Sequence, residues 1–256
     1  MRSIVLSDVH LGATCSNAPV FAAFLNSIKD EHFNHVIVIG DLVDFWRTDS
    51  AKTLEGNIAI LRALRDLHAD HSHYVIGNHD YSILGMASKY GWNPVVSKGL
   101  HITEGGHKFY FTHGYDMDVF LNMENLPLDV YEAFSEAMCH ADSTIGGIAS
   151  NLWDILSISA SDIRKVWNML KNPHKRKNPD SLYKFSTSGA AHWLYGLDPT
   201  TRLVFGHTHR PFINKTHTVA NTGSWCTDPG CSFTNTYVDI RDGEMGLKRY
   251  LVERNL

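Results

Sequence analysis

The chain has 256 residues, 43% of which are hydrophobic, and its formal net charge is −4. This length accommodates one large or two small domains with a sizeable core. The negative charge argues against general nucleic-acid binding, which requires an excess of basic residues on one surface.

Three apolar runs early in the chain are typical of buried strands in a parallel sheet. They occupy residues 4–6, 35–39 and 74–76. Helical spacing of apolar side chains predicts intervening helices over residues 19–29 and 53–68. Each strand ends in a polar cluster, and these clusters contain Asp8 and His10, Asp41 and Asp44, and Asn78, His79 and Asp80. Strands that alternate with helices in this way indicate an α/β fold.

The later strands also end in histidines. A hairpin predicted over residues 100–112 ends at His113. A short apolar strand over residues 202–205 leads into His207 and His209. A closing antiparallel hairpin is predicted near the C-terminus.

Helical spacing dominates residues 115–198, which we interpret as a helical insertion in a single domain spanning residues 1–256. Such an insertion would form a lid over the strand ends. Its apolar stripe consists of Leu152, Trp153, Leu156, Ile163, Trp167 and Leu170. The stripe either lines an acyl-chain groove or, as amphipathic helices more often do, packs against the core. A basic loop, with Lys171, Lys175, Arg176 and Lys177, either attracts a phosphorylated or membrane-surface substrate or is simply solvated.

The polar residues at the strand ends form a ligand set for metal ions. Their carboxylate and amide oxygens and imidazole nitrogens suit Mn²⁺, Fe²⁺, Co²⁺ or Zn²⁺ better than Ca²⁺ or Cu(I). The set consists of Asp8, His10, Asp41, Asn78, His79, His113, His207 and His209. Eight groups are too many for one ion, but one carboxylate bridging two ions would leave room for water. Two metals about 3.5–4 Å apart are a known device for displacement at phosphorus.

Each of these residues also has a purely structural interpretation. Asp8 or Asp41 could cap a helix, Asn78 could serve a turn, and His113 could be an ordinary buried histidine. These interpretations would have to hold in five separate blocks at once, which favours the metal site.

The five blocks resemble the calcineurin-like metallophosphoesterase family. They are Asp8-x-His10, Gly40-Asp41-x-x-Asp44, Gly77-Asn78-His79-Asp80, His113 and Gly206-His207-x-His209, in the family's order. The resemblance implies a four-layer αββα sandwich of two mixed β-sheets flanked by helices. It also implies two divalent metal ions, most naturally Mn²⁺, and hydrolysis of a phosphate ester by a metal-bridging hydroxide.

The resemblance assigns a role to each residue of the blocks. One ion would be bound by Asp8, His10, Asp41 and His209, and the other by Asp41, Asn78, His113 and His207, with Asp41 as the bridge. His79 would contact the phosphate and protonate the leaving oxygen, and Asp80 would orient His79. Asp44 is expected to support these groups, unless it only begins a helix.

Residues next to the blocks bear on the substrate. Phe45-Trp46 follows Asp44 where protein phosphatases of the family carry Arg-Gly, and the block is instead similar to the UDP-2,3-diacylglucosamine pyrophosphatase-like branch. Enzymes of that lipid step usually carry Arg where His79 stands, so a simple phosphate ester and a nucleotide-linked sugar or lipid both stay open. Arg47 either binds a substrate phosphate or forms a surface salt bridge.

Three functions therefore compete. The first is a dinuclear phosphoesterase, the second a pyrophosphatase, and the third an inactive protein-binding scaffold of the same fold. We expect a small phosphorylated substrate as the partner, no general nucleic-acid binding, and peripheral membrane contact as an open possibility.

The cysteines and the first residues of the chain suggest a compartment. Cys15, Cys139, Cys226 and Cys231 lack C-x-x-C spacing, so neither a zinc knuckle nor a disulfide framework is predicted. The first apolar run is too short for a signal peptide. We expect reduced thiols and a cytoplasmic protein.

Overall fold

The computed structural model describes residues 1–90, 94–123, 126–140, 179–227 and 233–251. The predicted apolar stripe over residues 152–170 and the basic loop over residues 171–177 lie outside the described residues, as does Cys231. Of the predicted insertion, residues 115–123, 126–140 and 179–198 are described.

A six-stranded mixed sheet contains the N-terminal strands of the chain. Its order is β11 (Glu244–Arg249), β10 (Thr236–Arg241), β1 (Arg2–Leu6), β2 (His32–Ile39), β3 (His68–Val75) and β4 (Val95–Ser97). Strands β1 to β4 are parallel, whereas β10 and β11 form the predicted closing hairpin, which pairs antiparallel with β1.

A five-stranded mixed sheet faces the first one. Its order is β5 (Gly99–Glu104), β6 (His107–Thr112), β7 (Arg202–Phe205), β9 (Val219–Asn221) and β8 (Phe212–Ile213). The predicted hairpin is β5–β6, and β7 pairs parallel with both β6 and β9. Residues that the sequence separates by the insertion are thereby brought side by side.

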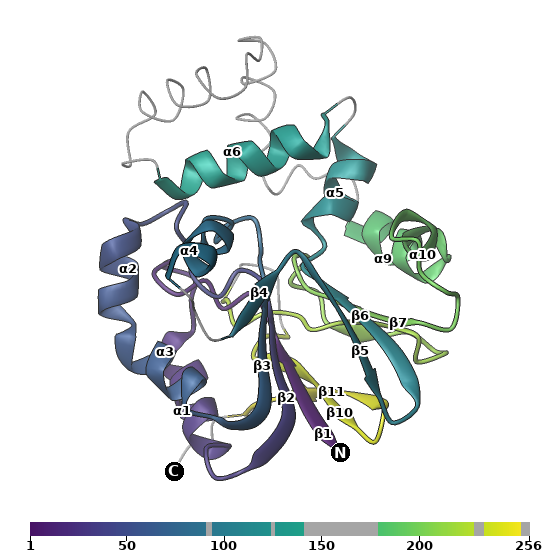
Figure 1. Cartoon of the computed structure of the whole chain (residues 1–256), viewed down its shortest axis with the longest axis horizontal. Helices are drawn as coiled ribbons and strands as arrows, with labels where there is room; N and C mark the ends of the chain where they lie inside the picture. The colour runs from purple at the N-terminus through teal and green to yellow at the C-terminus, as the bar shows by residue number, and fades with distance from the viewer. Residues whose placement is uncertain (91–93, 124–125, 141–178, 228–232, 252–256) are drawn as a thin grey trace.

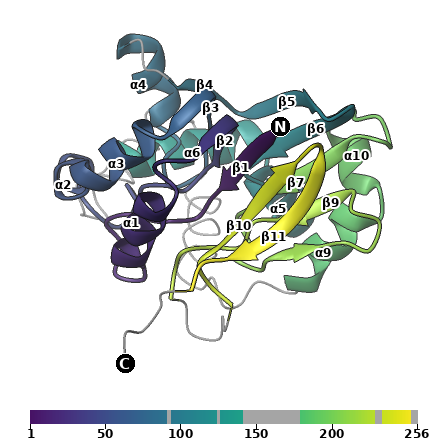
Figure 2. The same cartoon turned by 90° about the horizontal axis from the view of Figure 1, so that it is seen from below.

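Helices surround the two sheets (Figure 1; Figure 2). They are α1 (Ala18–Ser27), α2 (Ser50–Gly56), α3 (Ile58–Arg65), α4 (Ile83–Tyr90), α5 (Tyr115–Asn122), α6 (Leu128–His140), α9 (Pro179–Thr187) and α10 (Ala190–Leu194). The single helix predicted over residues 53–68 is wrong, because the backbone leaves the helical conformation at Asn57 and α3 starts anew there.

Alternation of side chains along the strands creates the layers. In β1, Ile4 and Leu6 join a cluster with Phe21 of α1, while Val5 packs between the two sheets. In β7, Val204 belongs to the inter-sheet core, and its neighbours Leu203 and Phe205 pack with the helical residues Met117, Leu182 and Ala191. The predicted αββα sandwich of two mixed sheets is therefore confirmed.

Helix α6 lies beyond the carboxyl ends of the parallel strands, on the same side as α5 (Figure 1). Among the helices of the described ranges, none combines the length and the apolar character needed to cross a bilayer.

Candidate metal centre

Loops at the carboxyl ends of β1, β2, β3, β6 and β7 carry the predicted ligands, and backbone hydrogen bonds join these loops. The amide of Asp8 donates to Gly40 O (3.1 Å) and that of His10 to Asp41 O (2.8 Å). The Gly206 amide donates to His113 O (3.0 Å), which links the loop after β7 to the end of β6. Ligands are expected at this edge in an α/β sheet.

Most of the predicted ligands have strained backbones. Five of them have φ between 51° and 66°, a region that residues other than glycine seldom adopt. They are Asp8, His10, Asp41, His207 and His209. Each such residue costs on the order of 1–3 kcal/mol and persists where the surrounding structure enforces it, typically at functional sites.

Two glycines allow the loops to approach each other closely. A Cβ atom at Gly77 would collide with Asp41 Oδ1, and one at Gly206 would collide with Asp8 Oδ2. The glycines of these sequence blocks are therefore required by contact with the carboxylates.

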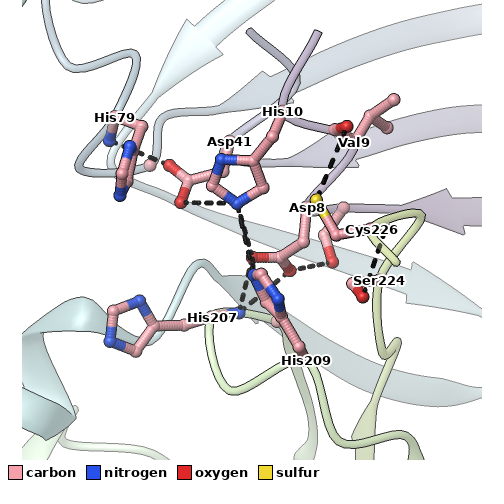
Figure 3. A network of polar contacts seen from close by, with 12 residues as sticks. Asp8, Val9, His10, Asp41, His79, His207, His209, Ser224 and Cys226 are labelled. Atoms are coloured by element: carbon pink, nitrogen blue, oxygen red, sulfur yellow. Dashed lines mark hydrogen bonds and ion pairs between the residues drawn. The ribbon is translucent and has the colours of Figure 1, made fainter. Parts of the chain in front are cut away.

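A first group of ligand atoms converges between the two sheets (Figure 3). His10 Nε2 lies 3.2 Å from His209 Nε2 and 3.5 Å from Asp41 Oδ2. His209 Nε2 lies 3.3 Å from Asp8 Oδ1. Ligands about 2.1 Å from one tetrahedral ion stand roughly 3.4 Å apart. Asp8, His10 and His209 therefore fit around a single ion, and Asp41 adjoins them through His10.

A second group adjoins the first through Asp41. His113 Nε2 lies 3.3 Å from Asp41 Oδ2 and 3.3 Å from His207 Nδ1. Asn78 is buried, and its Oδ1 has no hydrogen-bond partner. Buried polar atoms are rarely left unsatisfied, so an unpartnered oxygen here fits a metal ligand. Asp41 Oδ2 lies between the two groups, where a bridging carboxylate is needed.

The other ring nitrogen of three histidines is held by an acceptor. His10 Nδ1 lies 3.1 Å from Asp44 Oδ2, His113 Nδ1 lies 2.9 Å from Ile39 O, and His207 Nε2 lies 3.0 Å from Asp118 Oδ2. Such contacts fix the tautomer and aim the remaining nitrogen at a metal.

The sequence did not predict that Asp118 holds the ring of His207. Asp118 lies in the first turn of α5, five residues beyond His113, and it is buried. A second acid, Asp116, also lies in that turn, so the sequence does not show which carboxylate faces the site.

The predicted orientation of His79 by Asp80 is wrong. Asp80 accepts hydrogen bonds from the amides of Leu42 and Gly77 and from the Tyr74 hydroxyl, and it thereby ties β2 and β3 together. The carboxylate at His79 belongs to Asp44, whose Oδ1 lies 3.2 Å from His79 Nδ1. This pair is close but is not aligned as a hydrogen bond.

Asp44 thus connects several parts of the site. It contacts both His10 and His79, and its Oδ2 lies 3.0 Å from Nη1 of Arg47. Arg47 therefore forms a salt bridge, one of its two predicted roles, while half of its side chain stays exposed. Trp46 stacks on the His79 ring, with 4.3 Å between ring centroids.

The electrostatics of the centre favour positive charge. Burial opposes ionisation of Asp41, but the charges of His113 and His79 outweigh it, and the pKa of Asp41 falls well below its ordinary value. Burial opposes protonation of His113, but Asp41 outweighs it and raises the pKa of His113 to about 10. A cation bound between these groups would replace the proton that they otherwise share.

Comparisons with known proteins agree with this arrangement. A family model described as calcineurin-like phosphoesterase matches residues 1–211. A UDP-2,3-diacylglucosamine hydrolase from Nitrosococcus oceani is 35% identical over 220 residues, which cover 84% of this chain and 81% of that protein.

Solved structures show similarity at low sequence identity. YfcE, a phosphoesterase from E. coli, is 15% identical with a TM-score of 0.45, over 94% of this chain and 88% of that one. A zinc complex of Vps29 from Entamoeba histolytica is 14% identical with a TM-score of 0.44, over 98% of both chains.

Proposed function

Because the chain belongs to the calcineurin-like phosphoesterase family, we propose that seven of its residues bind the divalent metal ions used by that family. These residues are Asp8, His10, Asp41, Asn78, His113, His207 and His209. The observation that carries the proposal is the position of Asp41 Oδ2, 3.5 Å from His10 Nε2 and 3.3 Å from His113 Nε2. His10 and His113 would each help to hold one ion, and Asp41 would contribute to both sites.

The chain is a hydrolase of phosphate ester bonds, and its own residues suit such a reaction. When bound, two divalent ions activate water and neutralise charge on the phosphoryl oxygens. His79 would contact the phosphate, and two contacts support this role: Asp44 approaches its Nδ1 and Trp46 stacks on its ring. A protonated His79 would then donate its proton to the leaving oxygen.

Mn²⁺ is our first choice for the native metal. The donor set combines imidazole nitrogens with carboxylate and amide oxygens, which Mn²⁺, Fe²⁺, Co²⁺ and Zn²⁺ all accept. Metal analysis of the purified protein and reconstitution with each ion would identify the preferred one.

The similarity to a UDP-2,3-diacylglucosamine hydrolase makes the pyrophosphate bond of a nucleotide-linked lipid or sugar the second candidate. Phe45 and Trp46 beside the site favour the same branch of the family. A lipid substrate would bring the protein to a membrane surface, whereas a small phosphate ester would not.

A substrate panel with Mn²⁺ tests these proposals. The panel contains p-nitrophenyl phosphate, bis(p-nitrophenyl) phosphate and a UDP-linked acylated sugar, and it is run on wild type and Asp41→Asn. We expect metal-dependent hydrolysis that falls at least about 100-fold in the variant, since losing even a group that supports a ligand costs 10–100-fold. A variant with full activity would rule out the proposed centre. A wild-type protein that neither binds Mn²⁺ nor hydrolyses any member would favour the inactive scaffold.

A further inference from the structure

Two thiols outside the metal centre face each other across the fold. Cys15 follows the loop that carries Asp8 and His10, and Cys226 follows Trp225 in the segment after β9. Their Sγ atoms lie 3.0 Å apart, although 211 residues separate them in the chain. A disulfide bond is about 2.05 Å long, so the two sulfurs need to close by only about 1 Å. Figure 3 shows Cys226 beside Val9 and Asp8.

The backbones that carry the two thiols are already joined. Ser16 and Cys226 form an antiparallel bridge, and the amide of Thr227 donates to Cys15 O over 2.8 Å. The Thr227 hydroxyl donates to the same oxygen over 3.1 Å. The two segments are therefore held next to each other before any bond forms between the sulfurs.

The surroundings of the two thiols differ, which gives them different roles. Cys15 is half-buried, and its Sγ lies 3.9 Å from Nη1 of Arg47. A neighbouring guanidinium stabilises a thiolate, the species that attacks a disulfide. Cys226 is fully buried, so an oxidant in solution reaches Cys15 first.

We propose that Cys15 and Cys226 form a reversible disulfide, with a low-molecular-weight disulfide such as oxidised glutathione as the oxidant. The Cys15 thiolate attacks one glutathione sulfur and releases the other glutathione as a thiolate. Cys226 then gives up its proton and attacks Cys15 Sγ, which releases the second glutathione. The two protein thiols are oxidised together, and one glutathione disulfide is reduced to two thiols.

The cross-link would act on the metal centre through the loop after β1. Cys15 is five residues beyond His10, and a bond to Cys226 fixes that loop to the segment of the buried Trp225. Arg47 contacts both Cys15 and Asp44, so the site of oxidation adjoins the carboxylate that supports His10 and His79. A reducing compartment would keep the pair open, and oxidative stress would close it.

Peptide mapping of the full-length protein under non-reducing conditions tests the proposal. After equilibration with oxidised glutathione, we expect a linked pair of peptides containing residues 15 and 226, which excess reduced glutathione separates. The cross-link should also raise Tm by about 5 °C or more, since it closes a very long loop in the unfolded chain. Cys15→Ser should remove both the linked peptides and the redox dependence of Tm.

Cys139→Ala and Cys231→Ser are the matched controls, and both should retain the 15–226 link. The peptide map of the wild-type protein tests the link between residues 15 and 226 even if a cysteine variant folds poorly. Linkage of either cysteine to Cys139 or Cys231, a stable glutathione adduct on Cys15, or intact thiols under excess oxidant would each overturn the proposal.

Discussion

Two histidine clusters differ in their place in the fold: one lies in the loops that follow the strands, and the other, which begins at the amino-terminal ends of β2 and β3, lies within those strands. The metal centre contains His10, His79, His113, His207 and His209, and the amino-terminal cluster contains His32, His35, His68, His71 and His73. The first cluster surrounds the buried carboxylates Asp8 and Asp41. In the second, His32 contacts the exposed Asp70, and His35 and His73 contact each other over 3.1 Å.

The pKa values of His73 and His113, one from each cluster, move in opposite directions. Burial, together with the charges of His35 and His71, lowers the pKa of His73 to about 4. Burial acts the same way on His113, but Asp41 reverses the effect and raises that pKa to about 10. Within the described part of the chain, every group of three side chains that could hold a metal ion belongs to the metal centre. Buried carboxylates, and not the number of histidines, distinguish a metal site from a histidine-rich strand pair.

Replacing one histidine in each cluster is the strongest test of this distinction. His10→Ala removes a ligand of the first ion, and we expect activity to fall at least about 100-fold, more than the loss of a supporting residue. His35→Ala should leave activity within about twofold of wild type, because His35 lies within β2 and not in the loops that carry the proposed ligands. Metal content measured on both purified proteins should fall only in His10→Ala. Equal losses of metal in the two variants would show that the amino-terminal cluster also binds ions.

Replacing a carboxylate that holds a histidine of the metal centre should have a smaller and more selective effect on metal binding. Asp118→Asn leaves every proposed ligand in place but weakens the acceptor that fixes His207. We expect metal affinity to fall about 10–100-fold for one of the two ions. A two-step titration with Mn²⁺ should show one weakened step and one unchanged step. Asp70→Asn is the matched change in the amino-terminal cluster, and both titration steps should match those of wild type.

The sequence predicted which side chains meet at the strand ends better than it predicted the carboxylates that support them. Each ligand follows an apolar strand, and the parallel strands bring their carboxyl ends to one edge, so position in the chain suffices. The support of His79 depends instead on the direction of side chains within a turn. Asp80 is adjacent to His79 in sequence, but the turn directs its carboxylate toward the amides of Leu42 and Gly77.

Strand β3 shows a second limit of the sequence analysis. Only residues 74–76 were predicted as strand, because residues 68–73 are polar and lack apolar alternation. The structure extends β3 over His68–Val75, which pairs with β2 along its length. Pairing with β2 therefore outweighs the weak strand propensity of residues 68–73. The histidines of this segment are thus structural, although nothing in their spacing distinguishes them from ligands.

The amino-terminal cluster should influence stability at acidic pH, and this is the smallest effect we expect. The folded-state pKa of His73, about 4, lies below its ordinary value of 6.5. Protons therefore bind the unfolded chain more readily. The contribution of His73 to stability is fully present above about pH 6.5 and is lost as the pH falls toward about 4.

The variant His73→Gln removes this titration. Because the imidazole is only half-buried, solvent screening reduces the effect, and we expect the loss of Tm between pH 7 and pH 4.5 to shrink by about 2–4 °C. Metal-free protein is needed for the melts, since the loss of a bound ion at low pH would itself lower Tm. His68→Gln, at an exposed position of the same strand, is the control and should melt like wild type at both pH values. If His73→Gln also did so, the His35–His73 contact would have no role in acid sensitivity.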